Sequence, residues 1–258
     1  MTAPQAGSTS DDWEEHWSEY AESASLNPAQ EYRRRLVRRL LAAGPGARIL
    51  DIGSGQGDQA LDLLDAWPAA NVLGVDLSAA GIAVAQRKVP AATFLRHDLT
   101  EPLEPPGEYR AWATHAVCSE VLEHVERPEL LLANVTSLLA PGCRLVVTVP
   151  GGPRSAFDRH IGHRRHYTAD DLRALLEGAG FEVELAGGAG FPFFNLYRLA
   201  VVARGEKLVD DVSAGHGTVT GSARLAMRTF DVLFRANRSN TRHGWQIVAV
   251  ALAPPSTS

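Results

Sequence analysis

Two carboxylates and a histidine stand close together in the stretch Ser119-Glu120-Val121-Leu122-Glu123-His124. On a helix, Glu120, Glu123 and His124 lie at positions i, i+3 and i+4 and share one face. A histidine that a carboxylate orients can act as a general base. The stretch therefore predicts a proton-abstraction site with His124 as the base and Glu120 or Glu123 orienting it. In the alternative interpretation the two acids favour a helix N-terminus and His124 packs.

A second group of histidines follows later in the chain, with His160, His163 and His166 at three-residue steps just before Tyr167. One interpretation is a solvated loop in which Tyr167 and His163 tie down the next helix. In the other, His163 is a second candidate for the base. Mixed Glu and His ligands also suit Mg²⁺, Mn²⁺ or Zn²⁺, and a metal could lower the pKa of a substrate hydroxyl. The favoured prediction contains no metal.

A glycine-rich segment runs from Ile49 to Asp58 and reads as a strand, a tight turn and a helix start. Its glycines alternate as Gly-x-Gly-x-Gly, which differs from the dinucleotide fingerprint Gly-x-Gly-x-x-Gly because Asp58 stands at the third glycine position. A pyrophosphate would also lie between the negative charges of Asp51 and Asp58. A ligand with an amino-acid ammonium group and a sulfonium instead brings positive charge to these two acids. The segment thus predicts a loop whose backbone approaches such a ligand closely.

Two further acids end the strands that follow this loop. In an open parallel sheet, ligands bind at the carboxyl ends of the strands. Asp76 ends the strand expected over residues 71–76 and can accept both hydroxyls of a ribose. Asp98 follows the strand expected over residues 92–96 and can accept an adenine amino group, while Leu99 can pack on the ring.

Together these features resemble the motifs of the class I S-adenosylmethionine-dependent methyltransferases over roughly residues 45–185. The chain is similar to the small-molecule type of this family and resembles the methyltransferase type 11 and 12 groups and the ubiquinone-pathway O-methyltransferases. The resemblance implies an α/β fold, with a Rossmann-like, seven-stranded, mostly parallel sheet in the order 3-2-1-4-5-7-6 and an antiparallel last strand. The Glu-x-x-Glu-His stretch with its later His-x-x-His also resembles the metal site of the small-RNA 2′-O-methyltransferases.

The resemblance implies S-adenosylmethionine as the cofactor and assigns its contacts residue by residue. They are Asp51, Gly53, Ser54, Gly55 and Gln56 for the methionine moiety, Asp76 and Leu77 for the ribose, Asp98 and Leu99 for the adenine, and backbone contacts from Cys118 and Ser119.

Alternating strands and helices must position these residues, which calls for a parallel sheet. Strands are expected over residues 48–52, 71–76, 92–96, 113–118, 143–149, 181–185 and 245–252. Helices are expected from Pro28, with Asn27 as N-cap, and over residues 59–67, 79–88, 128–139 and 168–178. About sixty residues separate the last two strands, which is long for a connection, and they should form a helix to residue 207, a loop over 213–222 and a helix over 223–234. The predicted regions are an N-terminal helical lid (1–44), a cofactor-binding core (45–189), an inserted substrate cap (190–242) and the last strand with the tail (243–258).

Aromatic side chains gather in the two regions outside the core. Trp13, Trp17 and Tyr20 share one face of a short predicted helix. The insertion adds Phe191, Phe193, Phe194 and Tyr197. These residues are expected to form a flat apolar pocket over the sulfonium, and Tyr20 is a further candidate for the reaction itself.

The composition narrows the class of protein. The chain has 258 residues, 45% hydrophobic and 21% charged, a net charge of −5, and only two cysteines, Cys118 and Cys143. This excludes a disulfide framework and a cysteine-based zinc site, and argues against general nucleic-acid binding. No apolar run reaches membrane-spanning length, so a cytoplasmic protein, monomer or homodimer, is expected.

The function predicted from the sequence is methyl transfer from S-adenosylmethionine to a small, aromatic or polycyclic metabolite of bacterial specialised metabolism. Oxygen, nitrogen and carbon acceptors, an indole carbon included, all remain open. One alternative is a metal-assisted O-methyltransferase acting on a quinone precursor or an RNA terminus. Another is a module that binds S-adenosylmethionine without transferring the methyl group.

Overall fold

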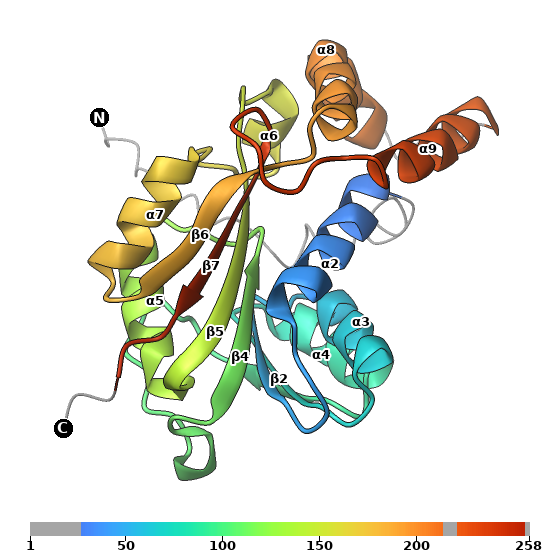
Figure 1. The fold of residues 1–258 in the computed structure, drawn as a ribbon. Coiled ribbons are helices and arrows are strands. Elements are labelled where there is room, and N and C mark those ends of the chain that lie inside the picture. Colours follow the sequence, from blue (N-terminus) through green and yellow to red (C-terminus); the bar gives the residue numbers. More distant parts are fainter. Residues whose placement is uncertain (1–26, 214–220, 256–258) are drawn as a thin grey trace, which may run out of the picture.

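A seven-stranded sheet forms the centre of the computed structural model, which describes residues 27–213 and 221–255 (Figure 1). The strand order β3-β2-β1-β4-β5-β7-β6 confirms the sequence prediction. Strands β1 to β5 are parallel, and β7 is antiparallel to both of its neighbours. The strands are β1 (Arg48–Ile52), β2 (Asn71–Asp76), β3 (Thr93–Arg96), β4 (Ala113–Ser119), β5 (Leu139–Pro150), β6 (Glu182–Ala189) and β7 (Gln246–Leu252).

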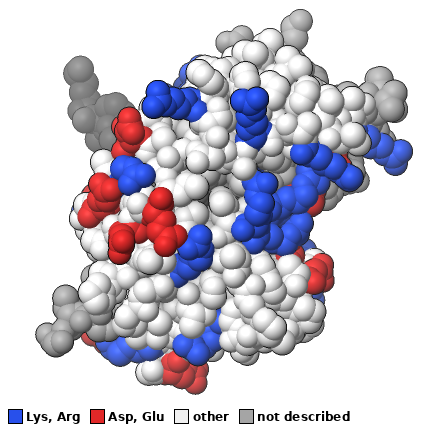
Figure 2. Space-filling view, in the orientation of Figure 1, with Lys and Arg blue, Asp and Glu red and all other residues white. Residues whose placement is uncertain are grey.

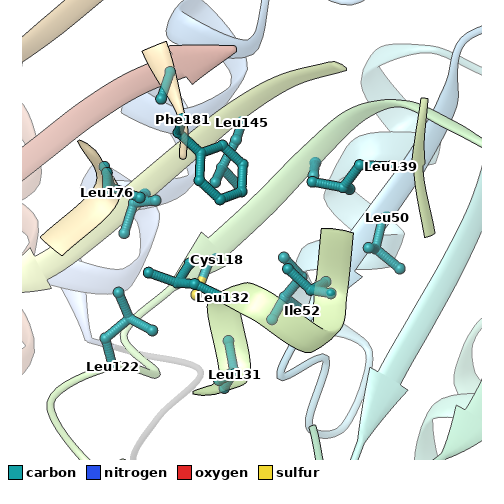
Figure 3. Close-up of a cluster of buried hydrophobic side chains, with 14 of the residues drawn as sticks. Leu50, Ile52, Cys118, Leu122, Leu131, Leu132, Leu139, Leu145, Leu176 and Phe181 are labelled. Carbon is teal, nitrogen blue, oxygen red and sulfur yellow. The ribbon is translucent and has the colours of Figure 1, made fainter. Parts of the chain in front are cut away.

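Helices cover both faces of the sheet. One face carries α2 (Pro28–Leu41), α3 (Asp58–Ala66) and α4 (Ala79–Lys88), and the other carries α5 (Pro128–Val135) and α7 (Ala169–Gly178) (Figure 1). Successive strand residues alternate between the two cores, as the two-residue period of a strand requires: Ile49 packs toward α2 and α3, whereas Leu50 and Ile52 pack toward α5 and α7. Figure 3 shows this second core, where Leu131 and Leu132 of α5 and Leu176 of α7 meet strand side chains.

The insertion between β6 and β7 contains the helices α8 (Phe193–Ser213) and α9 (Gly221–Phe234). They lie beyond the carboxyl end of the sheet and meet the start of α2 (Figure 1). Tyr32 and Leu36 of α2 pack with Phe194 of α8 and Phe234 of α9 in a separate apolar cluster. A short helix, α6 (Ala156–His160), follows β5, and 3₁₀ turns lie at Gly107–Tyr109 and Thr136–Leu138.

Arginines along α2 form the basic area that Figure 2 shows over this helix. Arg35 pairs with Asp231 of α9 at 2.9 Å, and Arg38 pairs with Asp62 of α3. Acids of neighbouring helices therefore pair with part of this basic area. None of the helices within the described residues is both long and apolar enough to cross a membrane.

Four predicted element boundaries were wrong by several residues. One is the end of the first helix of the insertion, since α8 extends to Ser213 rather than to residue 207. The helix predicted over 128–139 ends at Val135, and β5 begins at Leu139, so Pro141 and Gly142 lie inside a strand. Leu139 pairs with Ala113, and the register of β4 and β5 shifts after this pair, so the strand tolerates the stop signals. Strand β6 runs beyond residue 185 to Ala189 because β7 offers backbone partners that far.

Candidate active site

The glycine loop between β1 and α3 turns sharply at the carboxyl edge of the sheet. Gly53, Gly55 and Gly57 all have positive φ, at 71°, 50° and 79°, a region that side chains disfavour. The amide of Gly53 donates to the carbonyl of Val75 at 2.8 Å. A Cβ on Gly53 would stand 2.4 Å from Cγ2 of Val121, so only glycine fits.

Two acids flank this loop. Asp51 is 2% exposed, and among the described residues its Oδ2 has no hydrogen-bond partner. Burial, with smaller contributions from Asp76 and Asp58, raises the pKa of Asp51 to about 7. The carboxylate of Asp76 accepts the amides of Gly55 and Ser78, each at 2.8 Å. A buried carboxylate without a donor fits a ligand that brings one, such as an ammonium group.

The remaining predicted cofactor residues lie along the same edge. Leu77 is 47% exposed, whereas Leu99 is 5% exposed and packs into the core, so Leu77 rather than Leu99 offers an apolar surface for a ring. Asp98 is exposed and accepts the amide and hydroxyl of Thr100. Cys118 is fully buried at the end of β4, and Ser119 next to it shares a hydrogen bond of 2.8 Å with Thr148. Ser54 and Gln56 belong to the glycine loop itself.

The stretch after β4 is not the helix that its spacing predicted. Glu120 has a φ of +58° and residues 122–124 form a turn, so Glu120 and Glu123 do not share a helix face. Glu120 accepts from Gln246 at 2.8 Å and Thr148 at 3.2 Å, and pairs with Arg33 at 3.4 Å. These contacts from three distant elements hold Glu120, which the local pattern could not reveal.

Glu123 instead turns inward between two histidines. Its side chain is completely buried, and Oε1 lies 3.9 Å from Nε2 of His124 and 3.9 Å from Nε2 of His163. The two imidazole rings are nearly perpendicular, with centroids 4.7 Å apart. Neither carboxyl oxygen of Glu123 has a hydrogen-bond partner among the described residues. Burial, and then Glu120, raises the pKa of Glu123 well above its ordinary value, so the site favours the protonated form of this carboxyl.

Asp158 organises the second histidine group, and the sequence analysis did not single it out. It is 1% exposed, and Nη2 of Arg198 donates to both of its oxygens at 3.0 and 2.9 Å. Ser155 donates to it through its amide and hydroxyl, in the capping box that starts α6. Burial alone would raise the pKa of Asp158, but the hydrogen bonds from Arg198 and Ser155 lower it to about 2.

Two histidines face Asp158. Nδ1 of His163 lies 3.8 Å from Oδ1, and Nε2 of His166 lies 3.9 Å from Oδ2. Burial lowers the pKa of His163 to about 3 and also lowers the pKa of His166. Both rings are therefore neutral at pH 7. The pattern Ser-x-x-Asp in the sequence is typical of a helix cap and could have identified Asp158. No local pattern connects Arg198 to it.

Hydrogen bonds hold this loop against the turn after β4. The amide of Arg164 donates to the carbonyl of Glu123 at 2.8 Å, and its Nε donates to the carbonyl of His124 at 2.8 Å. The hydroxyl of Tyr167 donates to the carbonyl of Leu122 at 3.1 Å. Tyr167 thus does tie the segment down, through the turn that carries Glu123.

Two groups of side chains have the spacing of metal ligands, and His163 belongs to both. Potential ligand atoms lie within 4.8 Å of one another in Glu123, His124 and His163, and likewise in Asp158, His163 and His166. The first group offers a buried carboxyl and two imidazoles, a donor set that suits a divalent cation. In the second group, Arg198 already neutralises Asp158.

The predicted substrate aromatics divide into two kinds. Phe194 is 2% exposed and lies 5.4 Å from Tyr32 between ring centroids. Tyr197 lies beside it and donates to Asn27 at 3.1 Å. Phe193 is partly buried against the same cluster, whereas Phe191 is 36% exposed. Three of the four therefore pack the insertion onto α2. The remaining predicted residues, Trp13, Trp17 and Tyr20, lie outside the described residues.

Comparisons with known proteins agree with this architecture. A family model for a methyltransferase domain matches residues 26–186, which include the glycine loop and both histidine groups. The trans-aconitate 2-methyltransferase of Paracidovorax citrulli is 31% identical over 132 residues, covering 48% of this chain and 50% of that protein. The demethylmenaquinone methyltransferase of Thermus thermophilus is 35% identical over 131 residues, covering 49% of this chain and 57% of that protein. The chain thus spans about half the length of the curated relatives it matches.

Solved structures share the fold at low identity. Geranyl diphosphate C-methyltransferase from Streptomyces coelicolor, in complex with Mg²⁺, geranyl-S-thiolodiphosphate and S-adenosyl-L-homocysteine, has a TM-score of 0.54 at 16% identity. The match covers 86% of this chain and 75% of that one.

Proposed function

Because the chain belongs to the methyltransferase-domain family, whose cofactor is S-adenosylmethionine, we propose that it transfers a methyl group to a small-molecule acceptor. The observation that carries this proposal is the position of Glu123, His124 and His163 beside the glycine loop. Val121 packs directly over Gly53, and the turn that it opens leads to Glu123 two residues later. Side chains able to accept or donate a proton thus lie next to the loop expected to hold the cofactor.

The residues of the edge fit S-adenosylmethionine. Asp51 offers a buried carboxyl for the ammonium group, and the tight turn at Gly53 and Gly55 lets the backbone approach the methionine moiety. Asp76, fixed by two amides, keeps acceptor capacity for the ribose hydroxyls. Leu77 and Asp98 are exposed for the adenine. When bound, the cofactor supplies an electrophilic methyl group on a sulfonium.

The chain's own contribution is positioning and proton removal. Holding an acceptor near attack distance provides most of the acceleration in such a displacement. A positioned base adds about two to four orders of magnitude when the acceptor carries a proton. His124 and His163 are the candidates for this base, and the buried carboxyl of Glu123 lies between their Nε2 atoms.

The proposed acceptor is an aromatic or polycyclic metabolite of bacterial specialised metabolism, methylated on oxygen, nitrogen or carbon. Phe191, exposed at the start of the insertion, supports an apolar surface for such a molecule. The formal charge of −5 supports a small molecule rather than a nucleic acid. We place this activity in the cytoplasm.

The test combines binding with turnover. S-Adenosylhomocysteine is titrated calorimetrically into the wild type and into His124→Gln and His163→Gln variants, which are then assayed with phenol, indole and quinol acceptors. We expect all three proteins to bind, and the variant that lacks the base to lose about 10²- to 10⁴-fold in kcat. No binding by the wild type would refute the cofactor assignment. Binding without turnover of any acceptor would favour the module that does not transfer methyl groups.

A second candidate function is metal-assisted O-methylation of a quinone precursor or an RNA terminus. The observation that favours it is the buried carboxyl of Glu123, which lacks a hydrogen-bond donor while two imidazole nitrogens face it. Metal analysis before and after chelation distinguishes the two functions. A stoichiometric metal whose removal abolishes turnover supports the second, and turnover unchanged by chelation supports the first.

A further inference from the structure

We propose that His166 is a positioning residue that fixes the tautomer of His163, so that His163 carries its proton on Nδ1 and presents a bare Nε2 toward Glu123. The consequence for catalysis rests on the proposed function, in which a base takes a proton from the acceptor. The tautomer itself is a property of the folded chain and can be measured without turnover.

One hydrogen-bond partner of His166 can only accept a proton. The carbonyl oxygen of Gly152 lies 3.0 Å from Nδ1 of His166. A carbonyl has no proton to donate, so Nδ1 of His166 must carry the hydrogen. This contact also lies in the loop directly after β5, which places the ring of His166 relative to the sheet.

The direction of the next hydrogen bond then follows. Burial keeps His166 neutral at pH 7, and a neutral imidazole with a proton on one nitrogen offers only a lone pair on the other. Nε2 of His166 is thus an acceptor, and it lies 3.4 Å from Nδ1 of His163. Nδ1 of His163 must donate this bond. In the neutral ring of His163 this leaves Nε2 without a proton, and that atom is the one facing Oε1 of Glu123 at 3.9 Å.

Asp158 reinforces this arrangement. Its ionised carboxylate lies 3.8 Å from Nδ1 of His163 and 3.9 Å from Nε2 of His166. Because the carbonyl of Gly152 holds the proton of His166 on Nδ1, the carboxylate favours a proton on Nδ1 of His163. When Nε2 accepts a proton from a substrate hydroxyl or amine, the resulting imidazolium faces this negative charge. Arg198 and Ser155 hold Asp158 in place, so the carboxylate does not need to move during the reaction.

The same geometry distinguishes the two candidate bases. Nδ1 of His163 donates into a chain of hydrogen bonds that runs through His166 to the carbonyl of Gly152. The same nitrogen also faces the carboxylate of Asp158. This arrangement gives His163 a defined tautomer, and Asp158 offsets part of the desolvation that lowers the pKa of its ring. The inference therefore assigns proton removal to His163 and leaves His124 to line the site.

Nuclear magnetic resonance of the full chain tests the tautomer directly. Long-range ¹H–¹⁵N correlations of histidine-labelled protein near neutral pH report which ring nitrogen carries the proton, with signals assigned from His163→Gln and His166→Gln spectra. We expect Nδ1–H for both rings in the wild type, with S-adenosylhomocysteine present or absent. A wild-type His163 with its proton on Nε2 would overturn the proposal.

Paired variants test the dependence on His166. His166→Gln keeps an acceptor oxygen for Nδ1 of His163, whereas His166→Leu removes it. We expect the Leu variant to mix the tautomers of His163 and lose about tenfold in kcat with KM and cofactor affinity unchanged, and the Gln variant to stay within about threefold. His160→Gln, at an exposed position at the end of α6, is the matched control. An unchanged His163 tautomer in the Leu variant would contradict the proposal. The wild-type tautomer without any turnover would contradict the proposed function alone.

Discussion

The two halves of the candidate site are built in different ways. The cofactor half comes from consecutive elements, with Asp51, the glycine loop and Asp76 all within β1, α3 and β2 and their connections. The half proposed to take up the acceptor's proton combines residues from α2, the turn after β4, the loop after β5, the insertion and β7. Backbone geometry shapes the first half, and convergence of distant side chains shapes the second.

Burial dominates the electrostatics of both halves, but with different results. In the cofactor half it leaves Asp51 with a pKa of about 7, close to ionisation and ready for a cation. In the other half it raises the pKa of Glu123 and holds the ring of His163 neutral. A cation therefore gains most in the first half, whereas the second half presents an unprotonated imidazole. Changes that damage one half and spare the other test this division.

The largest expected effect is on stability in the second half. Phe194→Ala removes a ring from the cluster that joins α8 and α9 to α2, and such deletions cost about 3–5 kcal/mol. Urea denaturation should show this loss, while calorimetry should show S-adenosylhomocysteine affinity within about twofold of the wild type. Leu199→Ala, at a position 48% exposed on the same helix, is the control and should change stability by less than about 0.5 kcal/mol. Equal loss of stability and cofactor affinity would show that the halves are not independent.

The reverse experiment damages only the cofactor half. Gly53→Ala must hold a φ of +71°, which costs about 1–2 kcal/mol, and its Cβ meets Val121, which adds about 1–3 kcal/mol. We expect S-adenosylhomocysteine affinity to fall at least about 30-fold. Adding Val121→Ala should recover the part of the affinity that the contact with Cβ costs. The part of the loss that comes from the positive φ should remain. Gly107→Ala, where a Cβ meets nothing within 4 Å, should leave affinity unchanged, and wild-type affinity in Gly53→Ala would refute the role of the loop.

This contrast explains what the sequence could and could not predict. Strand order, the glycine loop and the acids of the cofactor half follow from local patterns and a family resemblance, because neighbouring residues determine their geometry. Glu120 adopts a left-handed backbone conformation, so the expected shared helix face for Glu120 and Glu123 was wrong. The group formed by Asp158, His166 and Arg198 assembles only when α6 and α8 pack together. No residue spacing in the sequence predicts that contact.

Asp51 adds a pH dependence of the folding stability. Its pKa is raised in the folded state from 3.8 to about 7, so between these values the folded chain holds a proton that the unfolded chain has lost. The free energy of unfolding should therefore fall by up to about 1.4 kcal/mol per pH unit as the pH rises through this window, and level off above it. Asp51→Asn should lack this component when the two urea-derived pH profiles are subtracted. A flat difference across the window would contradict the raised pKa.

The same titration should appear in cofactor binding. An ammonium group prefers the ionised form of Asp51, so affinity for S-adenosylhomocysteine should increase up to about tenfold per pH unit until the pH reaches about 7. Calorimetry in buffers with different ionisation enthalpies should detect the released proton. Binding without proton release below this pH would place the ammonium group elsewhere.

The smallest expected effect belongs to the ion pair between Arg35 of α2 and Asp231 of α9. Its atoms are 2.9 Å apart, but the side chains are 27% and 34% exposed, so solvent screens the pair. A double-mutant cycle with Arg35→Met and Asp231→Asn should give a coupling of about 0.2–1 kcal/mol that disappears at high salt. The pair joins the same helices as the Phe194 cluster, so the comparison separates packing from charge at one interface. A coupling as large as the Phe194→Ala effect would mean that charge pairing, rather than aromatic packing, fixes the insertion over the second half of the site.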